Sequence, residues 1–227
     1  ADTRRAARDA GIEIVSLHWL LVAPEGLSIT DPDDNVRART IDVMRRLIDL
    51  CGELGGTALV HGSPLQRRLT AGDEDGTRDR ATACFAAVAD TAKAAGVLYC
   101  IEALAPQDAE FINRVSEAAA MVDVIGSPHV RTMLDCCATA RLDEETPADL
   151  IDRWLPSGHM AHVQVNDGNG QGPGQGDLDF KPILAALQRH GYAGTVAVEP
   201  FDYVPDGPAA AARAIGYLRG IEEALRV

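Results

Sequence analysis

Four short apolar runs in this sequence each end in a side chain that can coordinate a divalent cation. The terminal residues are Glu102, Asp135, Gln164 and Glu199. Successive members of this set are separated by roughly 30 residues, the length of one strand–helix unit. Three carboxylates and one amide oxygen suit a hard or borderline cation such as Mg²⁺ or Mn²⁺. The spacing therefore predicts a metal site built from four strand ends.

The elements around these residues decide whether the four side chains can meet. Short apolar strands are predicted at 12–21, 57–60, 98–102, 131–135, 161–164 and 195–199. Helices are predicted at 1–10, 36–54, 78–95, 113–125, 147–154, 180–190 and 209–225. This alternation indicates a parallel sheet covered by helices. The carboxyl ends of such strands share one rim of a barrel, where barrel enzymes carry their chemistry. We expect an α/β chain with one domain over residues 1–227.

Six strand–helix units are visible, whereas a closed parallel barrel has eight. The chain opens within a predicted helix and does not begin with Met. We therefore expect a (β/α)8 barrel whose first two strand–helix units are absent from this chain. An open six-stranded sheet leaves edge strands with which another chain can pair, and this is one route to a homodimer.

The composition narrows the class of partner. Of the 227 residues, 46% are hydrophobic, enough for a sizeable core. The formal net charge of −13 argues against nucleic-acid binding, which needs a basic face, and against an anionic membrane surface. No apolar run approaches the roughly 20 residues of a membrane span. We expect a small-molecule partner.

The cysteines do not form a zinc signature. Their number is odd and their spacing matches none of the usual metal motifs. They are Cys51, Cys84, Cys100, Cys136 and Cys137. Cys100 and Cys136 fall in predicted strands, where a small core residue is the expected role. This usage fits a reduced, cytoplasmic location.

Several motifs resemble the xylose-isomerase-like superfamily of sugar and sugar-phosphate isomerases and epimerases, which has the TIM-barrel fold. Ketose 3-epimerases, hydroxypyruvate isomerases and inosose dehydratases have the most similar pattern. The motifs are Ile101-Glu102, Leu134-Asp135, the run from His162 to Asp167, the run from Gly172 to Phe180, and Val198-Glu199-Pro200-Phe201. The stretch from His162 to Phe180 is the most specific of them. The resemblance covers nearly the whole chain, as the last six of eight units.

This resemblance implies roles for the four strand-end residues. Glu102, Asp135, Gln164 and Glu199 would be the metal ligands. Glu102 and Glu199 would also be the catalytic pair that transfers a proton on opposite faces of the substrate. Gln164 stands where ketose epimerases usually have His, and it resembles the hydroxypyruvate isomerase branch. We expect the ion to be Mn²⁺, with Mg²⁺, Co²⁺ and Zn²⁺ as alternatives.

Two positions differ from the pattern of the family. The family often has a substrate-contacting His three residues after the Asp ligand, and Ala138 stands there. The epimerases often have Asn-Arg where this chain has Asn169-Gly170. Both differences affect positions that contact the substrate in the family. They therefore favour one alternative to an enzyme, a non-catalytic binding subunit.

Four further polar residues are predicted to contact the substrate. His18 and His61 end predicted strands, His162 lies on the same strand face as Gln164, and Asp167 begins a glycine-rich loop. A histidine at such a place can bind a hydroxyl or relay a proton, and the alternative is a hydrogen-bonded structural role. Gly168 to Gly176 is read as a rim loop over the substrate, with a plain long turn as the alternative.

The expected chemistry is proton transfer next to a carbonyl. A Lewis-acidic cation stabilises the enediolate, while one carboxylate removes the proton and another group returns it. Return to the opposite face gives an epimer, and return to the neighbouring carbon gives an isomer. We expect a metal-dependent isomerase or epimerase of a sugar or keto-sugar, phosphorylated or not. The alternatives are a lyase such as a keto-inositol dehydratase, which loses a hydroxyl from the same enediolate, and a non-catalytic carbohydrate-binding subunit.

Overall fold

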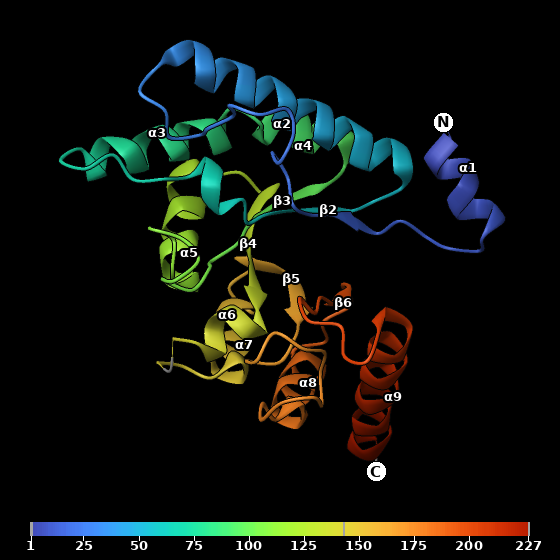
Figure 1. Cartoon of the computed structure of the whole chain (residues 1–227). Helices are drawn as coiled ribbons and strands as arrows, with labels where there is room; N and C mark the ends of the chain where they lie inside the picture. Colours follow the sequence, from blue (N-terminus) through green and yellow to red (C-terminus); the bar gives the residue numbers. More distant parts are fainter. Residues whose placement is uncertain (1, 143, 227) are drawn as a thin grey trace.

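Six parallel strands form a curved sheet in this protein, whose computed structural model describes residues 2–142 and 144–226 (Figure 1). The strands are β1 (Ser16–Leu17), β2 (Ala58–His61), β3 (Leu98–Ile101), β4 (Val130–Asp135), β5 (Met160–Val165) and β6 (Val196–Val198). Their order in the sheet follows the chain from β1 to β6. Each connection crosses one face through a helix, as consecutive parallel strands require. All six carboxyl ends therefore lie at one rim.

The sheet is open between its first and last strands. β1 pairs with β2 and β6 pairs with β5, and the described residues form no ladder between β1 and β6. The prediction of a parallel barrel represented by six strand–helix units is confirmed. β1 has two residues, far fewer than the predicted 12–21, because it has a neighbour on one side only within the described chain.

Helices cover the outer face of the sheet (Figure 1). The helices of the described chain are α1 (Asp2–Asp9), α2 (Asp34–Leu54), α3 (Glu74–Ala86), α4 (Ala89–Ala95), α5 (Val115–Ile125), α6 (Cys136–Ala140), α7 (Pro147–Trp154), α8 (Phe180–Arg189) and α9 (Gly207–Leu225), with a 3₁₀ turn at Pro64–Gln66. Of these, α1 buries no residue and stands apart from the sheet. None of the described helices combines the length and apolarity needed to cross a bilayer.

Two helices differ from the sequence-based expectation. The segment 78–95 is not one helix, because the chain breaks at Ala87 and Val88 between α3 and α4. Arg45 of α2 donates from Nη2 to the Ala87 carbonyl over 3.1 Å, so the freed carbonyl keeps a partner. The short helix α6 is an addition, and Asp135 begins it as its N-cap.

Strand alternation divides the apolar side chains into two layers. The larger core lies between sheet and helices and includes Tyr99, Phe85 and Ile48. A small inner layer contains Val60, Cys100 and Met133. The inner layer matters for the site, because residues two positions further along the same strands face the same way. All five cysteines are free and buried, which confirms the core role expected for Cys100 and Cys136. The prediction that Cys136 lies in a strand is wrong, because β4 ends at Asp135 and Cys136 is the first residue of α6.

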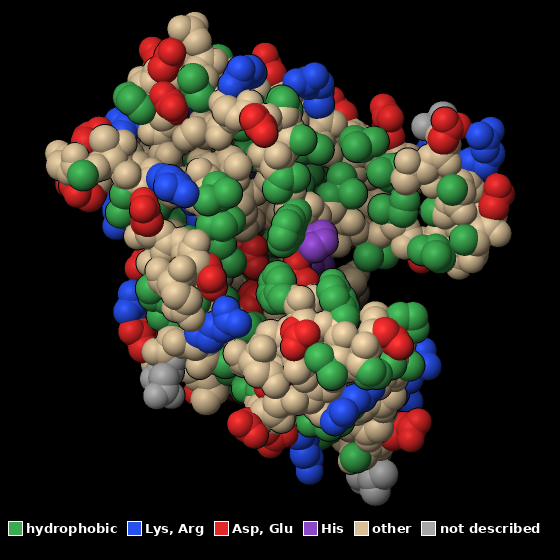
Figure 2. All heavy atoms as spheres, viewed as in Figure 1, with side chains coloured by type: hydrophobic (Ala, Val, Ile, Leu, Met, Phe, Trp, Pro, Cys, Tyr) green, Lys and Arg blue, Asp and Glu red, His purple; other side chains and the backbone are tan. Residues whose placement is uncertain are grey.

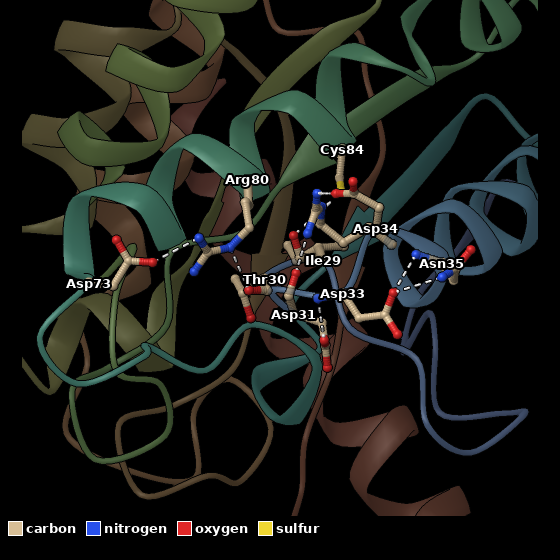
Figure 3. A network of polar contacts seen from close by, with 10 residues as sticks. Ile29, Thr30, Asp31, Asp33, Asp34, Asn35, Asp73, Arg80 and Cys84 are labelled. Atoms are coloured by element: carbon tan, nitrogen blue, oxygen red, sulfur yellow. Dashed lines mark hydrogen bonds and ion pairs between the residues drawn. The ribbon is translucent and has the colours of Figure 1, made fainter.

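The loop after β1 is fastened to α3 by a polar network (Figure 3). Arg80 of α3 donates from Nε to the Thr30 carbonyl over 2.9 Å and from Nη1 to Asp73 over 2.8 Å. The Cys84 thiol donates to the Ile29 carbonyl over 3.4 Å. Asp33 then caps α2 by accepting from the Asn35 amide over 2.8 Å. These contacts hold the segment that follows the rim end of β1.

Candidate functional site

Three carboxylates converge at the rim of the sheet. One ligand oxygen each from Glu102, Asp135 and Glu199 lie within 4.8 Å of one another. They follow β3, end β4 and follow β6, respectively. Gly62 makes room for this arrangement, because a Cβ at that position would lie 2.2 Å from Glu102 Oε2. The cluster therefore depends on the absence of a side chain just after β2.

Gln164 supplies a fourth oxygen near these strand ends. Its position on β5 pairs in register with Asp135 on β4. The side chain is 3% exposed, and its Oε1 has no hydrogen-bond partner among the described residues. A buried amide oxygen without a partner costs about 1–3 kcal/mol, so such an atom is expected to have a ligand. The donor set of three carboxylates and one amide oxygen fits a hard or borderline divalent cation.

The pKa values of two of the clustered carboxylates also indicate a cation site. Burial, followed by the charges of Asp135 and Glu199, raises the pKa of Glu102 well above its usual range. Burial raises the pKa of Asp135 to about 6, although the Ala138 amide and Asn166 oppose this change. Carboxylates this close repel one another in a medium of low dielectric constant. A bound cation removes that repulsion, which is the physical reason for such a cluster to bind one.

Neighbouring groups fix the orientation of Asp135. Its Oδ1 accepts a hydrogen bond from the Ala138 amide over 2.7 Å, and its Oδ2 accepts from Asn166 Nδ2 over 2.9 Å. The same Asn166 amide donates to the Glu199 carbonyl over 3.1 Å. Asn166 therefore links β4 and β6 through the end of β5. Its place two residues after Gln164, on the same strand face, was the signal for this role.

A buried arginine, Arg67, makes a hydrogen bond to the backbone of Glu102. Arg67 is fully buried and donates from Nη1 to the Glu102 carbonyl over 2.7 Å. Its charge also opposes the rise in the pKa of the Glu102 carboxyl. Arg67 lies in the segment after the 3₁₀ turn, and no sequence pattern marked it as part of the site.

His18 and Glu199 meet across the opening of the sheet. His18 Nδ1 lies 2.7 Å from Glu199 Oε1. His18 directly follows β1 and Glu199 directly follows β6, the two strands that border the opening. The hydrogen bond to Glu199 raises the pKa of His18, against the opposing effect of burial. His18 is therefore placed to orient the carboxylate and to exchange a proton with it.

A cavity of about 350 Å³ opens over the cluster. Figure 2 shows acidic side chains inside the hollow, with hydrophobic side chains and a histidine at its edge. The polar lining comes from Glu102, Asp135, Glu199, Asp108, Arg141, His18 and Ser63. Trp19 and Phe201 line the same cavity and are 63% and 54% exposed. Charged groups beside exposed aromatic rings suit a small polar ligand that also has an apolar face.

The sequence matches the family described as xylose isomerase-like TIM barrel over residues 1–221. The chain belongs to this family. Solved structures agree on the fold: an L-ribulose 3-epimerase superposes with a TM-score of 0.84, at 24% identity, over 99% of this chain and 80% of that one. A 3-keto-D-glucoside 4-epimerase from E. coli gives a TM-score of 0.83, at 19% identity, over 96% of this chain and 83% of that one.

Curated relatives of this xylose isomerase-like chain include sugar epimerases. The D-psicose 3-epimerase of Ruminiclostridium cellulolyticum is 30% identical over 181 residues, or 79% of this chain and 60% of that protein. The L-ribulose 3-epimerase of Mesorhizobium japonicum is 30% identical over 183 residues, or 76% of this chain and 58% of that protein. The chain thus spans about three-fifths of the length of these relatives.

Four predicted site residues of this family member lie outside the cavity lining, namely Gln164, His61, Asp167 and His162. His61 is fully buried and faces the helices, where its Nδ1 lies 2.6 Å from the Tyr99 hydroxyl. Strand alternation explains this placement, because the preceding Val60 faces inward. The expectation that His61 reaches the substrate overlooked this alternation.

Asp167 lies beneath the glycine-rich loop. It is 1% exposed and accepts from the amides of Gly168, Gly176 and Leu178 over 3.0, 2.8 and 3.2 Å. The carboxylate thus anchors this loop, and it does not line the cavity. Gly176 is required at this contact, because a Cβ there would lie 2.2 Å from Asp167 Oδ1.

His162 lies on the inner face, as predicted, but it is 2% exposed and does not line the cavity. Its Nε2 has no partner among the described residues. Burial, with a smaller contribution from the charge of His18, lowers the pKa of His162 to about 4. The ring is therefore neutral near pH 7, and a contact with substrate stays a prediction for this residue.

Gln164→Leu is expected to weaken Mn²⁺ binding by at least about tenfold, equivalent to about 1.4 kcal/mol. The same change should leave the metal-free protein as stable as before or more stable, because it removes a buried oxygen without a partner. Titration with Mn²⁺ and thermal unfolding of the metal-free forms measure the two effects. Unchanged Mn²⁺ affinity would exclude Gln164 as a ligand, and Gln188→Leu on the surface of α8 is the matched control.

Proposed function

We propose that this chain forms the active site of a metal-dependent isomerase or epimerase of a sugar or keto-sugar. The observation that carries the proposal is the cluster of three carboxylates that lines one open cavity, with Gln164 in register beside Asp135 and its buried oxygen unpartnered among the described residues. The names of the relatives support the sugar as substrate class and epimerisation as reaction. The match covers only about three-fifths of each relative, so the activity of the relatives is proposed for this chain and is not assigned to it by the match alone.

Glu102, Asp135, Gln164 and Glu199 would hold the cation. Mn²⁺ is the proposed ion, because carboxylates with an amide oxygen suit it, and Mg²⁺, Co²⁺ and Zn²⁺ are the alternatives. When bound, the cation supplies Lewis-acid stabilisation of the charge that develops on the carbonyl oxygen of the substrate. This chemistry is what makes a carbon-bound proton removable near neutral pH.

Glu102 and Glu199 are the proposed proton-transfer pair. They approach the cluster from β3 and β6, on opposite sides of the strand ends that carry Asp135 and Gln164. One of the two carboxylates takes the proton from the carbon next to the carbonyl. The other member of the pair, on the opposite face of the substrate, returns a proton to the enediolate. His18 orients Glu199 through its 2.7 Å contact and can pass the proton onward. Trp19 and Phe201 would exclude water from the sugar face.

The test is solvent deuterium exchange into a panel of ketoses, together with metal analysis. The wild-type protein is expected to hold about one Mn²⁺ per chain and to place deuterium on the carbon next to the carbonyl. Glu199→Gln should lose both properties, because the residue is a proposed ligand and a proposed proton carrier. A folded wild-type protein that binds no metal and exchanges no deuterium would contradict the proposal.

Two alternatives are distinguished by the same measurement. An unsaturated product would identify a lyase, in which the enediolate expels a hydroxyl group. A chain that binds sugars without exchange would be a carbohydrate-binding subunit. Ala138 and Gly170 favour the second alternative, since both stand where the family often has substrate-reading side chains.

A further inference from the structure

The cavity wall carries one ion pair that the proposed chemistry does not use. Arg141 Nη1 lies 3.3 Å from Asp108 Oδ2, and both residues line the cavity over the carboxylate cluster. Their side chains are 32% and 44% exposed. Arg141 caps the C-terminal end of α6, and Asp108 lies in the segment after β3. Partial exposure leaves both charged groups accessible to a ligand in the cavity.

Gly170 leaves space beside this guanidinium. Its φ of 82° lies in the left-handed region, which favours glycine. A Cβ at this position would lie 3.7 Å from Arg141 Nη2 and 4.0 Å from Phe201 Cβ. The missing side chain therefore leaves a methyl-sized gap between the guanidinium and the Cβ of Phe201, two residues that line the cavity. Arg141 Nε donates to the Gly168 carbonyl over 3.3 Å, which holds the side chain at this gap.

The charges around the cavity decide what kind of group fits there. Arg141 is the only Lys or Arg among the described residues that line the cavity, and Asp108 already balances its charge. The remaining acidic lining consists of Glu102, Asp135 and Glu199. A phosphate dianion in the cavity beside Arg141 would meet no unbalanced cation of the described lining residues. A pair of hydroxyl groups, by contrast, finds a donor in Arg141 and an acceptor in Asp108.

We propose that the Arg141–Asp108 pair is the substrate-reading element of this cavity and selects an unphosphorylated, hydroxyl-bearing end of a sugar. The inference rests on the proposed function, because it assumes that a sugar enters the cavity. It adds a specificity-determining arginine just after α6 and narrows the substrate class to neutral sugars. The guanidinium donates to the hydroxyl oxygens, Asp108 accepts from a neighbouring hydroxyl, and Phe201 packs on the apolar face of the sugar.

L-ribulose and L-ribulose 5-phosphate test this inference, because they differ only in the phosphate. Calorimetric titration of the Mn²⁺-loaded protein should give at least about tenfold tighter binding of L-ribulose. Arg141→Met should weaken the binding of L-ribulose by about tenfold or more, since hydrogen bonds from a charged donor are lost. Asp108→Asn should remove or reverse the preference, because it leaves the positive charge of Arg141 unbalanced.

Matched controls isolate the effect of the pair. Arg153→Met and Asp123→Asn make the same changes in residues whose ion-pair partners, Glu145 and His159, lie outside this cavity, and both should bind like the wild type. Wild-type affinity of Arg141→Met for L-ribulose, or tighter binding of the phosphate by the wild type, would overturn the inference. If deuterium exchange persists in that case, the proposed function stands and only the role of the pair fails. A metal-loaded protein that binds neither sugar overturns the inference, and exchange into the panel of ketoses then decides the proposed function separately.

Discussion

Glu102→Gln is expected to lower deuterium exchange into the ketose substrate by roughly 10²–10⁴-fold, the contribution of a positioned proton-transfer group. The amide cannot accept a proton from carbon, and it is a weaker ligand for a hard cation than a carboxylate. The protein should remain folded, because Gln has nearly the shape of Glu and relieves the repulsion from Asp135 and Glu199. Exchange measured by NMR and Mn²⁺ content measured on the same sample separate the two effects.

The control for this substitution is Glu223→Gln, an exposed residue of α9 outside the cavity. It should exchange deuterium at the wild-type rate. If Glu102→Gln kept at least half of the wild-type exchange rate, proton transfer would have to be assigned to other groups. If it lost Mn²⁺ and exchange together, and exchange returned at high Mn²⁺ concentration, Glu102 would be a ligand but not a proton carrier.

The metal-free protein is expected to become less stable as the pH rises from about 4 to above 6. Asp135 has its pKa raised from 3.8 to about 6, and the pKa of Glu102 is raised as well, in both cases mainly by burial. The folded state therefore holds protons that the unfolded chain has lost, and the free energy of unfolding falls as the pH increases. For Asp135 alone, the raised pKa corresponds to roughly 3 kcal/mol. Saturating Mn²⁺ should remove this loss, because ligand at about 100 times its Kd adds about 2.7 kcal/mol.

Urea unfolding at several pH values, with and without Mn²⁺, measures this dependence. Asp135→Asn is the informative variant, because Asn can still cap α6 while it carries no titrating proton. Its metal-free stability should change less between pH 4 and pH 7 than that of the wild type. Equal pH profiles for the two metal-free proteins would contradict the prediction that folding raises the pKa of Asp135.

The strand ends could be predicted from the sequence because two signals coincide there. Each run of buried residues stops at a polar side chain, and the interval matches one strand–helix unit. Strand alternation also placed His162 and Gln164 on one face, as the structure has them. These are local properties of β-strands, so they can be recognised in the sequence without knowledge of the packing.

The wall of the cavity could not be predicted in the same way. Arg67 reaches Glu102 from 35 positions away through a loop that has no periodic pattern. Arg141 reaches the cavity because α6 turns the chain after Asp135, and a helix of five residues is too short to show helical spacing. Such contacts depend on tertiary packing, which the order of residue types does not encode locally.

The contact between His18 and Glu199 joins residues that follow the two border strands of the sheet. The distance between His18 Nδ1 and Glu199 Oε1 therefore depends on the separation of β1 and β6, and not on any single loop. A change in the curvature of the sheet would stretch this contact before it disturbed Asp135, which is held within the middle strands. A substitution in either border strand of the sheet can therefore change how Glu199 is held, although no residue that lines the cavity has been altered.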